Sequence, residues 1–258
     1  YLITPGEEMV SSLREEGSAE EETLAAELRW VGKNFPAKKY ARVFLDHGGQ
    51  LAQMSQDKHP GKKDGAEWLR VPEVAEVISR WRKEVPGEVE LLFLQQCGKG
   101  TLENSHALKD TARYVMGSQT RVGAPNGYYV PALRHVCAHP EIDGRELAKR
   151  ILAGEVESMF TTYTVLDAAA LAKLPDHLNA ALAPLLALGE KVAPLPEGPI
   201  APLCFDFTPD ERFYDGLRLL EALYEANGLD GGPLDTFKTW VGKELVAAHR
   251  VSPAQKKT

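Results

Sequence analysis

The feature that most constrains the fold is a nearly unbroken apolar run at residues 89–94, which leads through two glutamines into Cys97. Such runs are typical of strands in parallel sheets, because helices cover both faces of these sheets. A second strand is predicted at residues 40–49, and an amphipathic helix at residues 71–85 lies between the two strands. This alternation of strand and helix predicts an α/β sandwich with a mostly parallel sheet.

The expected elements continue this alternation on both sides of the apolar strand. A helix is predicted at residues 18–35, because Ser18 can serve as its N-cap and Glu21 completes a capping box. The polar residues 50–66 are expected to form an exposed loop, and the Thr- and Val-rich residues 162–167 are expected to form the last strand. Later helices are predicted at residues 130–140, 143–159, 168–192, 211–229 and 236–251.

Composition argues against several functional classes. The 258 residues carry 30 Lys and Arg against 37 Asp and Glu, a formal charge of −7, which argues against a nucleic-acid partner. No apolar run approaches the roughly 20 residues of a membrane span. No signal peptide is visible, so we expect no membrane partner and a cytoplasmic location. Three cysteines without a CxxC pair predict neither a disulfide framework nor a zinc site, and no cofactor is expected.

The two predicted strands each end in a reactive residue. The first ends in His47 and Gly48, and the second ends in Cys97, which Gly98 follows. Because the carboxyl ends of parallel strands meet at one edge of a sheet, His47 and Cys97 are expected to be neighbours. A histidine can activate a thiol and protonate a leaving amine. The glycines let a substrate backbone approach, and the N–H groups of Gly48 and Cys97 can bind an oxyanion. A buried, inert thiol beside a loop histidine is the alternative.

The stretches around these residues resemble the clostripain-like cysteine peptidases, a family with a caspase-like fold. The stretches that carry the resemblance are "LAAELRWVGKNFPAKKYARVFLDHGG", "QQCGKG", "SHALKDTARYVMGSQ", "NGYYV", "IDGRELAKRI" and "TYTVLDAAALAKL". Together they run from about Leu24 to about Leu188, and beyond that the resemblance is patchy.

The resemblance implies a bacterial peptidase domain with a caspase-like three-layer α/β/α sandwich. It assigns residues 1–190 to this domain and residues 191–258 to a C-terminal helical extension packed on it. Family domains also begin with a strand, a helix and a second strand before a segment like "YLI". We therefore expect the chain to be a fragment, or a separate N-terminal chain to complete its sheet.

By the same resemblance, His47 is the acid–base group and Cys97 is the nucleophile. Relatives usually place an acid two positions before the cysteine, where it binds an Arg or Lys side chain of the substrate. Here that position is the neutral Gln95, which puts a preference for basic residues in doubt unless another acid substitutes for it. Ser118, Asn126 and Tyr128 lie where the family lines its substrate groove. Lys62 and Lys63 form a possible self-cleavage site.

These observations leave three hypotheses. The first is a cysteine endopeptidase that uses the Cys97 thiolate and His47 and acts on a protein or peptide substrate. The second is a catalytically silent caspase-like module that binds a partner. The third is an α/β hydrolase acting on small amides. A thiol probe separates the first two, because a silent module would not be labelled at Cys97.

Overall fold

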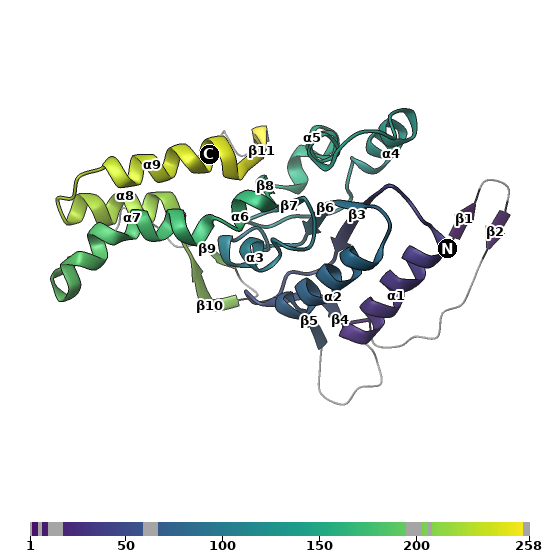
Figure 1. Cartoon of the computed structure of the whole chain (residues 1–258), viewed down its shortest axis with the longest axis horizontal. Coiled ribbons are helices and arrows are strands. Elements are labelled where there is room, and N and C mark those ends of the chain that lie inside the picture. The colour runs from purple at the N-terminus through teal and green to yellow at the C-terminus, as the bar shows by residue number, and fades with distance from the viewer. Residues whose placement is uncertain are drawn as a thin grey trace.

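The computed structural model describes residues 18–58, 67–194 and 212–254 with their side chains (Figure 1). Outside these ranges it describes the backbone of β1 (Leu2–Thr4), β2 (Glu7–Met9), β9 (Leu203–Phe205) and the first part of β10 (Thr208–Phe213). These four strands pair as two small antiparallel hairpins, β1 with β2 and β9 with β10.

A five-stranded sheet forms the centre of the molecule. Its strands in spatial order are β11 (Val246–Val251), β8 (Thr162–Asp167), β7 (Tyr114–Gly117), β6 (Glu88–Gln95) and β3 (Lys39–Leu45). The pairs β3–β6 and β6–β7 are parallel, whereas β7–β8 and β8–β11 are antiparallel. Only β8 therefore runs against the other four, and the expected mostly parallel sheet is confirmed.

Helices cover both faces of the sheet. The helices are α1 (Glu21–Asn34), α2 (Val71–Glu84), α3 (Leu102–Ala107), α4 (Tyr129–Ala138), α5 (Gly144–Gly154), α6 (Ala168–Leu171), α7 (Leu174–Leu188), α8 (Gly216–Ala226) and α9 (Gly232–Trp240). In Figure 1, α1 and α2 lie on one side of the sheet and α4 and α5 on the other, while α7, α8 and α9 extend beyond it. No helix among the described residues is long and apolar enough to cross a membrane.

The strand β6 contributes to two apolar cores because its side chains alternate between the faces of the sheet. Leu92 and Leu94 belong to the core that packs on α1 and α2. Leu91 and Phe93 belong to the core that packs on α4 and α5. All four side chains are fully buried, which confirms the interpretation of the apolar run as a strand covered on both faces.

Two expectations for the first third of the chain are wrong. Ser18 does not cap α1, whose N-cap is Glu20; the Ser18 N–H instead donates a hydrogen bond to Asp57 Oδ2 at 2.8 Å. The expected loop at 50–66 contains β4 (Gln53–Asp57), which pairs with β5 (Glu67–Arg70). This hairpin is stabilised by one apolar anchor in a polar stretch, because Met54 is fully buried.

The C-terminal segment also departs from the sequence prediction. The helix expected at 236–251 ends as α9 at Trp240, continues through a π-helical turn at Val241–Leu245, and gives way to β11. The helix expected from residue 211 begins only at Gly216, after β10. The last strand of the sheet is therefore β11 and not β8, and the division of the chain at residue 190 stays a prediction.

Candidate active site

The register of β3 and β6 places the two reactive residues side by side. Leu45, the last residue of β3, pairs with Gln95, the last residue of β6. His47 and Cys97 each lie two positions beyond these partners, so both strands end earlier than the sequence predicted and the two residues lie in the loops that follow. The loops after the strands are in close contact, because a Cβ placed on Gly48 would lie 1.9 Å from the Cys97 carbonyl oxygen. Only glycine fits at position 48, and the two loops form one rim of the sheet.

The imidazole of His47 and the thiol of Cys97 are not hydrogen-bonded to each other among the contacts of the described residues. His47 is exposed, and its backbone N–H donates to Asp46 Oδ1 at 2.5 Å. The Cys97 Sγ instead lies between the backbone groups of Val122, 3.4 Å from its nitrogen and 3.5 Å from its oxygen. The segment around Val122 therefore covers one side of the thiol.

Two backbone donors beside the thiol are unoccupied. Among the described residues, neither the Gly48 N–H nor the Cys97 N–H donates a hydrogen bond. The next amide, that of Gly98, is already bonded to the Thr120 carbonyl at 3.0 Å, and Gly98 has a φ of 67°. A left-handed φ of this kind favours glycine. The two unused N–H groups are suited to bind a developing negative charge on oxygen.

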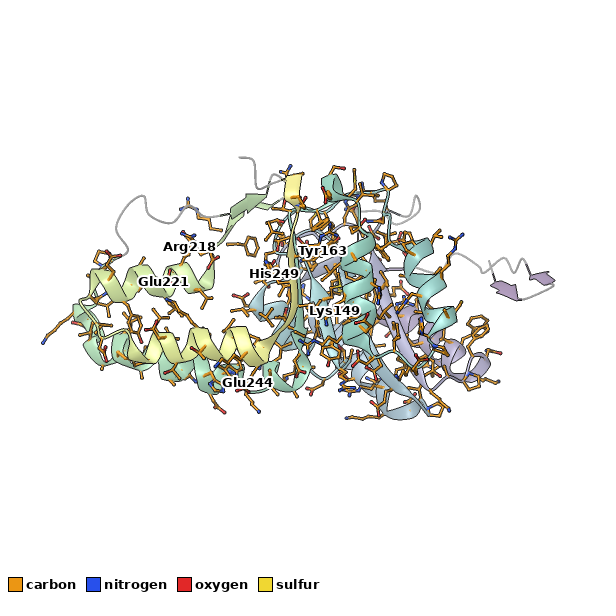
Figure 2. The ribbon with its side chains drawn as sticks, turned by 90° about the horizontal axis from the view of Figure 1, so that it is seen from above. Lys149, Tyr163, Arg218, Glu221, Glu244 and His249 are labelled. Atoms are coloured by element: carbon orange, nitrogen blue, oxygen red, sulfur yellow. The ribbon has the colours of Figure 1, made fainter. Side chains whose placement is uncertain are left out.

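Gln95 is buried, with 1% of its surface exposed, on the face of the sheet that packs on α4 and α5. Its Oε1 accepts a hydrogen bond from the Tyr128 hydroxyl at 2.5 Å. Its Nε2 and the hydroxyl of Tyr163 are both buried without a hydrogen-bond partner among the described residues. Tyr163 lies on β8 beside the edge strand that carries His249 (Figure 2).

The electrostatics of this region raise the pKa of both tyrosines. Burial is the main cause for Tyr128 and for Tyr163, and the negative charge of Glu155 adds to it in both cases. Cys97 also contributes for Tyr163, which places this hydroxyl within electrostatic range of the thiol. Glu155 is itself buried, and its carboxylate accepts hydrogen bonds from the N–H groups of Gly127 and Val156.

The structure places the other residues expected at the site in different surroundings. Ser118 is buried beside Gln95, because the residues before them, Gly117 and Leu94, are paired, and its Oγ contacts Thr120. Asn126 is half-buried and its side chain bonds to Gly123 and Glu155, not to Gln95 or Cys97. Lys62 and Lys63 lie outside the described residues.

Several residues of this region were missed in the sequence. Lys99 was missed because lysines are almost never buried, and Glu155 for the same reason. Tyr163 was noted only as part of a strand, whereas Tyr128 was expected in the substrate groove without its contact to Gln95. The register of β6, β7 and β8 places Tyr163 at the same level of the sheet as Gln95. The sequence does not predict this position, because the composition of β8 does not reveal its antiparallel direction.

The chain resembles several solved structures of peptidases. It shares 16% identity with a secreted C11 cysteine protease from Bacteroides thetaiotaomicron in complex with an irreversible peptide inhibitor, with a TM-score of 0.65 and 91% of this chain covered. It shares 18% identity with an inactive zymogen C11 protease from Parabacteroides distasonis, with a TM-score of 0.66 and 95% of this chain covered. The chain spans 64% and 65% of the lengths of those two chains.

At such low identities these structures establish the fold alone, which is caspase-like as expected. No protein with a curated description matches the chain. The family model described as the clostripain family, of C11 peptidases, matches residues 6–193, nearly three quarters of the chain. The match includes both strand ends and the rim that they form, and the chain belongs to the clostripain family of cysteine peptidases.

Proposed function

We propose that this chain carries the catalytic residues of a cysteine endopeptidase, with Cys97 as the nucleophile and His47 as the acid–base group. The observation that carries the proposal is the position of both residues two places beyond one paired register, Leu45 with Gln95. Membership of the clostripain family supports it, and so does the unoccupied pair of N–H groups at Gly48 and Cys97.

The proposed reaction proceeds by acyl transfer. The Cys97 thiolate attacks the carbonyl carbon of a peptide bond, and the carbonyl oxygen becomes an oxyanion held by the N–H groups of Gly48 and Cys97. The C–N bond then breaks, and His47 gives a proton to the leaving amine. A water molecule, deprotonated by His47, attacks the thioester and releases the carboxylic acid and the free thiol.

The proposed pocket for the side chain before the cleaved bond contains Gln95. Its amide is neutral, and its Oε1 is already bonded to the Tyr128 hydroxyl. Glu155 is the buried acid whose charge acts on both tyrosines of this region. A cation in this pocket would therefore meet no carboxylate at position 95, and discrimination for Arg or Lys should be weaker than where an acid occupies that position.

We also propose that an N-terminal segment completes the sheet, in the same polypeptide or as a second chain. Among the described strands β3 pairs only with β6, so its other edge has no partner. The side chains of β3 are mostly exposed or half-buried, whereas those of β6 are almost all buried. An open edge next to the candidate active site is a place for a further strand.

A catalytically silent, partner-binding module is the second candidate. It is favoured by one observation, the contact of the Cys97 sulfur with Val122 in place of His47. The experiment that separates the two is a positional peptide library combined with a thiol-reactive peptide probe, applied to the full-length protein. Cleavage together with labelling at Cys97 supports the peptidase. A protein that neither cleaves nor is labelled at Cys97 would be the silent module.

A further inference from the structure

A fully buried lysine connects the loop of His47 to the loop of Cys97. Lys99, two residues after the candidate nucleophile, has 1% of its surface exposed. Its Nζ donates hydrogen bonds to the Gln50 carbonyl oxygen at 2.5 Å and to the Leu51 carbonyl oxygen at 3.0 Å. Both carbonyls belong to the loop that begins with His47 and Gly48.

Two more side chains join the same loops. Asn104, on α3, donates from Nδ2 to the Leu51 carbonyl oxygen at 2.9 Å, so this oxygen accepts bonds from both Lys99 and Asn104. Gln96 donates from Nε2 to Ser55 Oγ at 2.9 Å, and the Ser55 N–H donates to the His47 carbonyl oxygen at 3.1 Å. The backbone that carries His47 is therefore held at both of its ends.

The other side of the Cys97 loop is fixed to the sheet. Gly98 N–H and Gly100 N–H donate to the Thr120 and Ser118 carbonyl oxygens at 3.0 Å and 2.8 Å. Lys99 thus extends from a rigid turn towards the His47 loop. None of these bonds uses the imidazole, the thiol, or the N–H groups of Gly48 and Cys97, which leaves all four reacting groups available.

We propose that Lys99 is a positioning residue, which holds the backbone of the His47 loop at the distance from Cys97 that catalysis requires. This inference rests on the proposed function of the two residues. An ammonium group is suited to this position because it offers three donors from one atom, and two adjacent carbonyls converge on it. Its charge strengthens both bonds in a buried setting. A buried ammonium group without hydrogen-bond acceptors has a high free energy. Movement of the loop away from Lys99 would therefore be strongly unfavourable.

The residue does not touch the substrate, and its effect on the reaction is through geometry. A misplacement of about 1 Å between reacting groups can cost about 10²-fold in rate. Loss of the Nζ bonds should therefore lower kcat and leave KM nearly unchanged, because the groups that contact the substrate remain. A purely structural lysine would behave differently, since its replacement would lower the free energy of unfolding but leave the kcat of the folded protein unchanged.

The test is Lys99→Met in the full-length protein, compared with Lys109→Met as the matched control. Lys109 is a partly exposed lysine whose Nζ lies 3.3 Å from Asp110 Oδ2, and it donates no hydrogen bond to either loop among the described residues. We expect Lys99→Met to lower kcat by about 10- to 100-fold with a KM within about twofold of wild type. We also expect faster hydrogen exchange of the amides at 47–52 in this variant, and wild-type values for both in Lys109→Met.

A second variant covers the case in which Lys99→Met does not fold. Asn104→Leu removes one of the two side-chain donors to the Leu51 carbonyl and should give a smaller change of the same kind in kcat and in exchange at 47–52. Wild-type kcat and exchange in both variants would overturn the proposal. A wild-type protein that cleaves nothing and is unlabelled at Cys97 would instead refute the proposed function. In that case the comparison of amide hydrogen exchange at 47–52 between wild type and Lys99→Met would still test whether Lys99 holds the loop.

Discussion

Cys97 and Cys137 are the two cysteines whose thiols the structure describes, and their surroundings differ. Cys97 is half-buried at the end of β6, next to two unoccupied backbone N–H groups. Cys137 is exposed near the C-terminal end of α4. At the scale of single residues, the expected reactivity of a thiol therefore depends on the hydrogen-bond donors and contacts around it and not on its being a cysteine.

The first prediction concerns the nucleophile. Cys97→Ala should abolish peptide cleavage and labelling by a thiol-reactive peptide probe, because no other described thiol lies beside two unoccupied N–H groups at a strand end. Cys137→Ala is the matched control and should leave both near wild type. Cleavage assays and mass spectrometry of the labelled peptide measure the two effects. Cleavage near the wild-type rate in Cys97→Ala would rule out the assignment.

The second prediction concerns His47. His47→Ala should lower kcat by at least about 10²-fold, the usual contribution of a positioned acid–base group. The fold should survive, because the side chain is exposed. His139→Ala, an exposed histidine at the end of α4, serves as the control. Steady-state kinetics and thermal unfolding are the measurements, and unchanged turnover in His47→Ala would show that another group moves the proton.

The third prediction concerns the pocket. Gln95→Glu keeps the length of the side chain and adds a negative charge, so it should raise the preference for Arg or Lys before the cut. A charge-assisted hydrogen bond contributes about 1.5–3 kcal/mol, or roughly 10- to 100-fold. Gln95→Met has the same length without the charge and should not raise this preference. A peptide-library profile measures it, and a wild type already strict for basic residues, unchanged in Gln95→Glu, would contradict this view of Gln95.

At the scale of elements, the sequence predicted the helices and strands that an apolar pattern alone specifies. The strand β6 and the helix α2 were found because Val74, Ile78 and Trp81 repeat at helical spacing and the strand is apolar throughout. The strand β11 was missed because its alanines and valines also suit a helix, and only pairing with β8 decides between the two. His47 and Cys97 were found because they follow strands, whereas Lys99 depends on tertiary contacts that leave no local pattern.

The fourth prediction concerns the two buried tyrosines between the sheet and α4. Tyr163→Phe removes a hydroxyl that has no partner among the described residues, so it should stabilise the protein by about 1 kcal/mol. Tyr128→Phe removes the donor to Gln95 Oε1 and should destabilise it by about 1–3 kcal/mol, because the carbonyl is left unpaired. Denaturant unfolding measures both, and the same sign in both variants would contradict this pairing.

The alkaline pH dependence provides a second readout of the same pair. Burial raises the pKa of Tyr163 and of Tyr128 in the folded protein. Above a pH of about 10 the unfolded chain releases these protons and the folded protein keeps them, so the free energy of unfolding falls as pH rises. This loss should begin near pH 10 and be smaller in Tyr163→Phe than in wild type.

At the scale of the whole molecule, the two edges of the sheet have different neighbours. The β11 edge lies beside α5, where Arg145 donates to the Ala247 carbonyl oxygen. The β3 edge has no paired strand in the part of the chain that the structure describes. Unpaired edges promote association between chains. We therefore expect the β3 edge to favour self-association when the chain is produced alone.

The fifth prediction follows from that edge. Residues 1–258 produced alone should self-associate and unfold at a lower temperature than the same residues with the proposed N-terminal segment, supplied in one polypeptide or as two. Light scattering and thermal unfolding measure the two effects. An intact-mass measurement and a denaturing gel of the natural active protein should show the additional segment. A stable, active monomer made of residues 1–258 alone would contradict the prediction.

The pairing of β8 with β11 has a consequence for folding during synthesis on the ribosome. Every residue assigned to the site is synthesised before β11, since β8 ends at Asp167 and β11 begins at Val246. At about 5–20 residues per second, β8 waits several seconds for its partner. During that interval one edge of β8 is unpaired, while the loops of His47 and Cys97 are already synthesised. The unpaired β8 strands of chains on neighbouring ribosomes of one messenger RNA can then pair with each other, and a chaperone that covers β8 would prevent this.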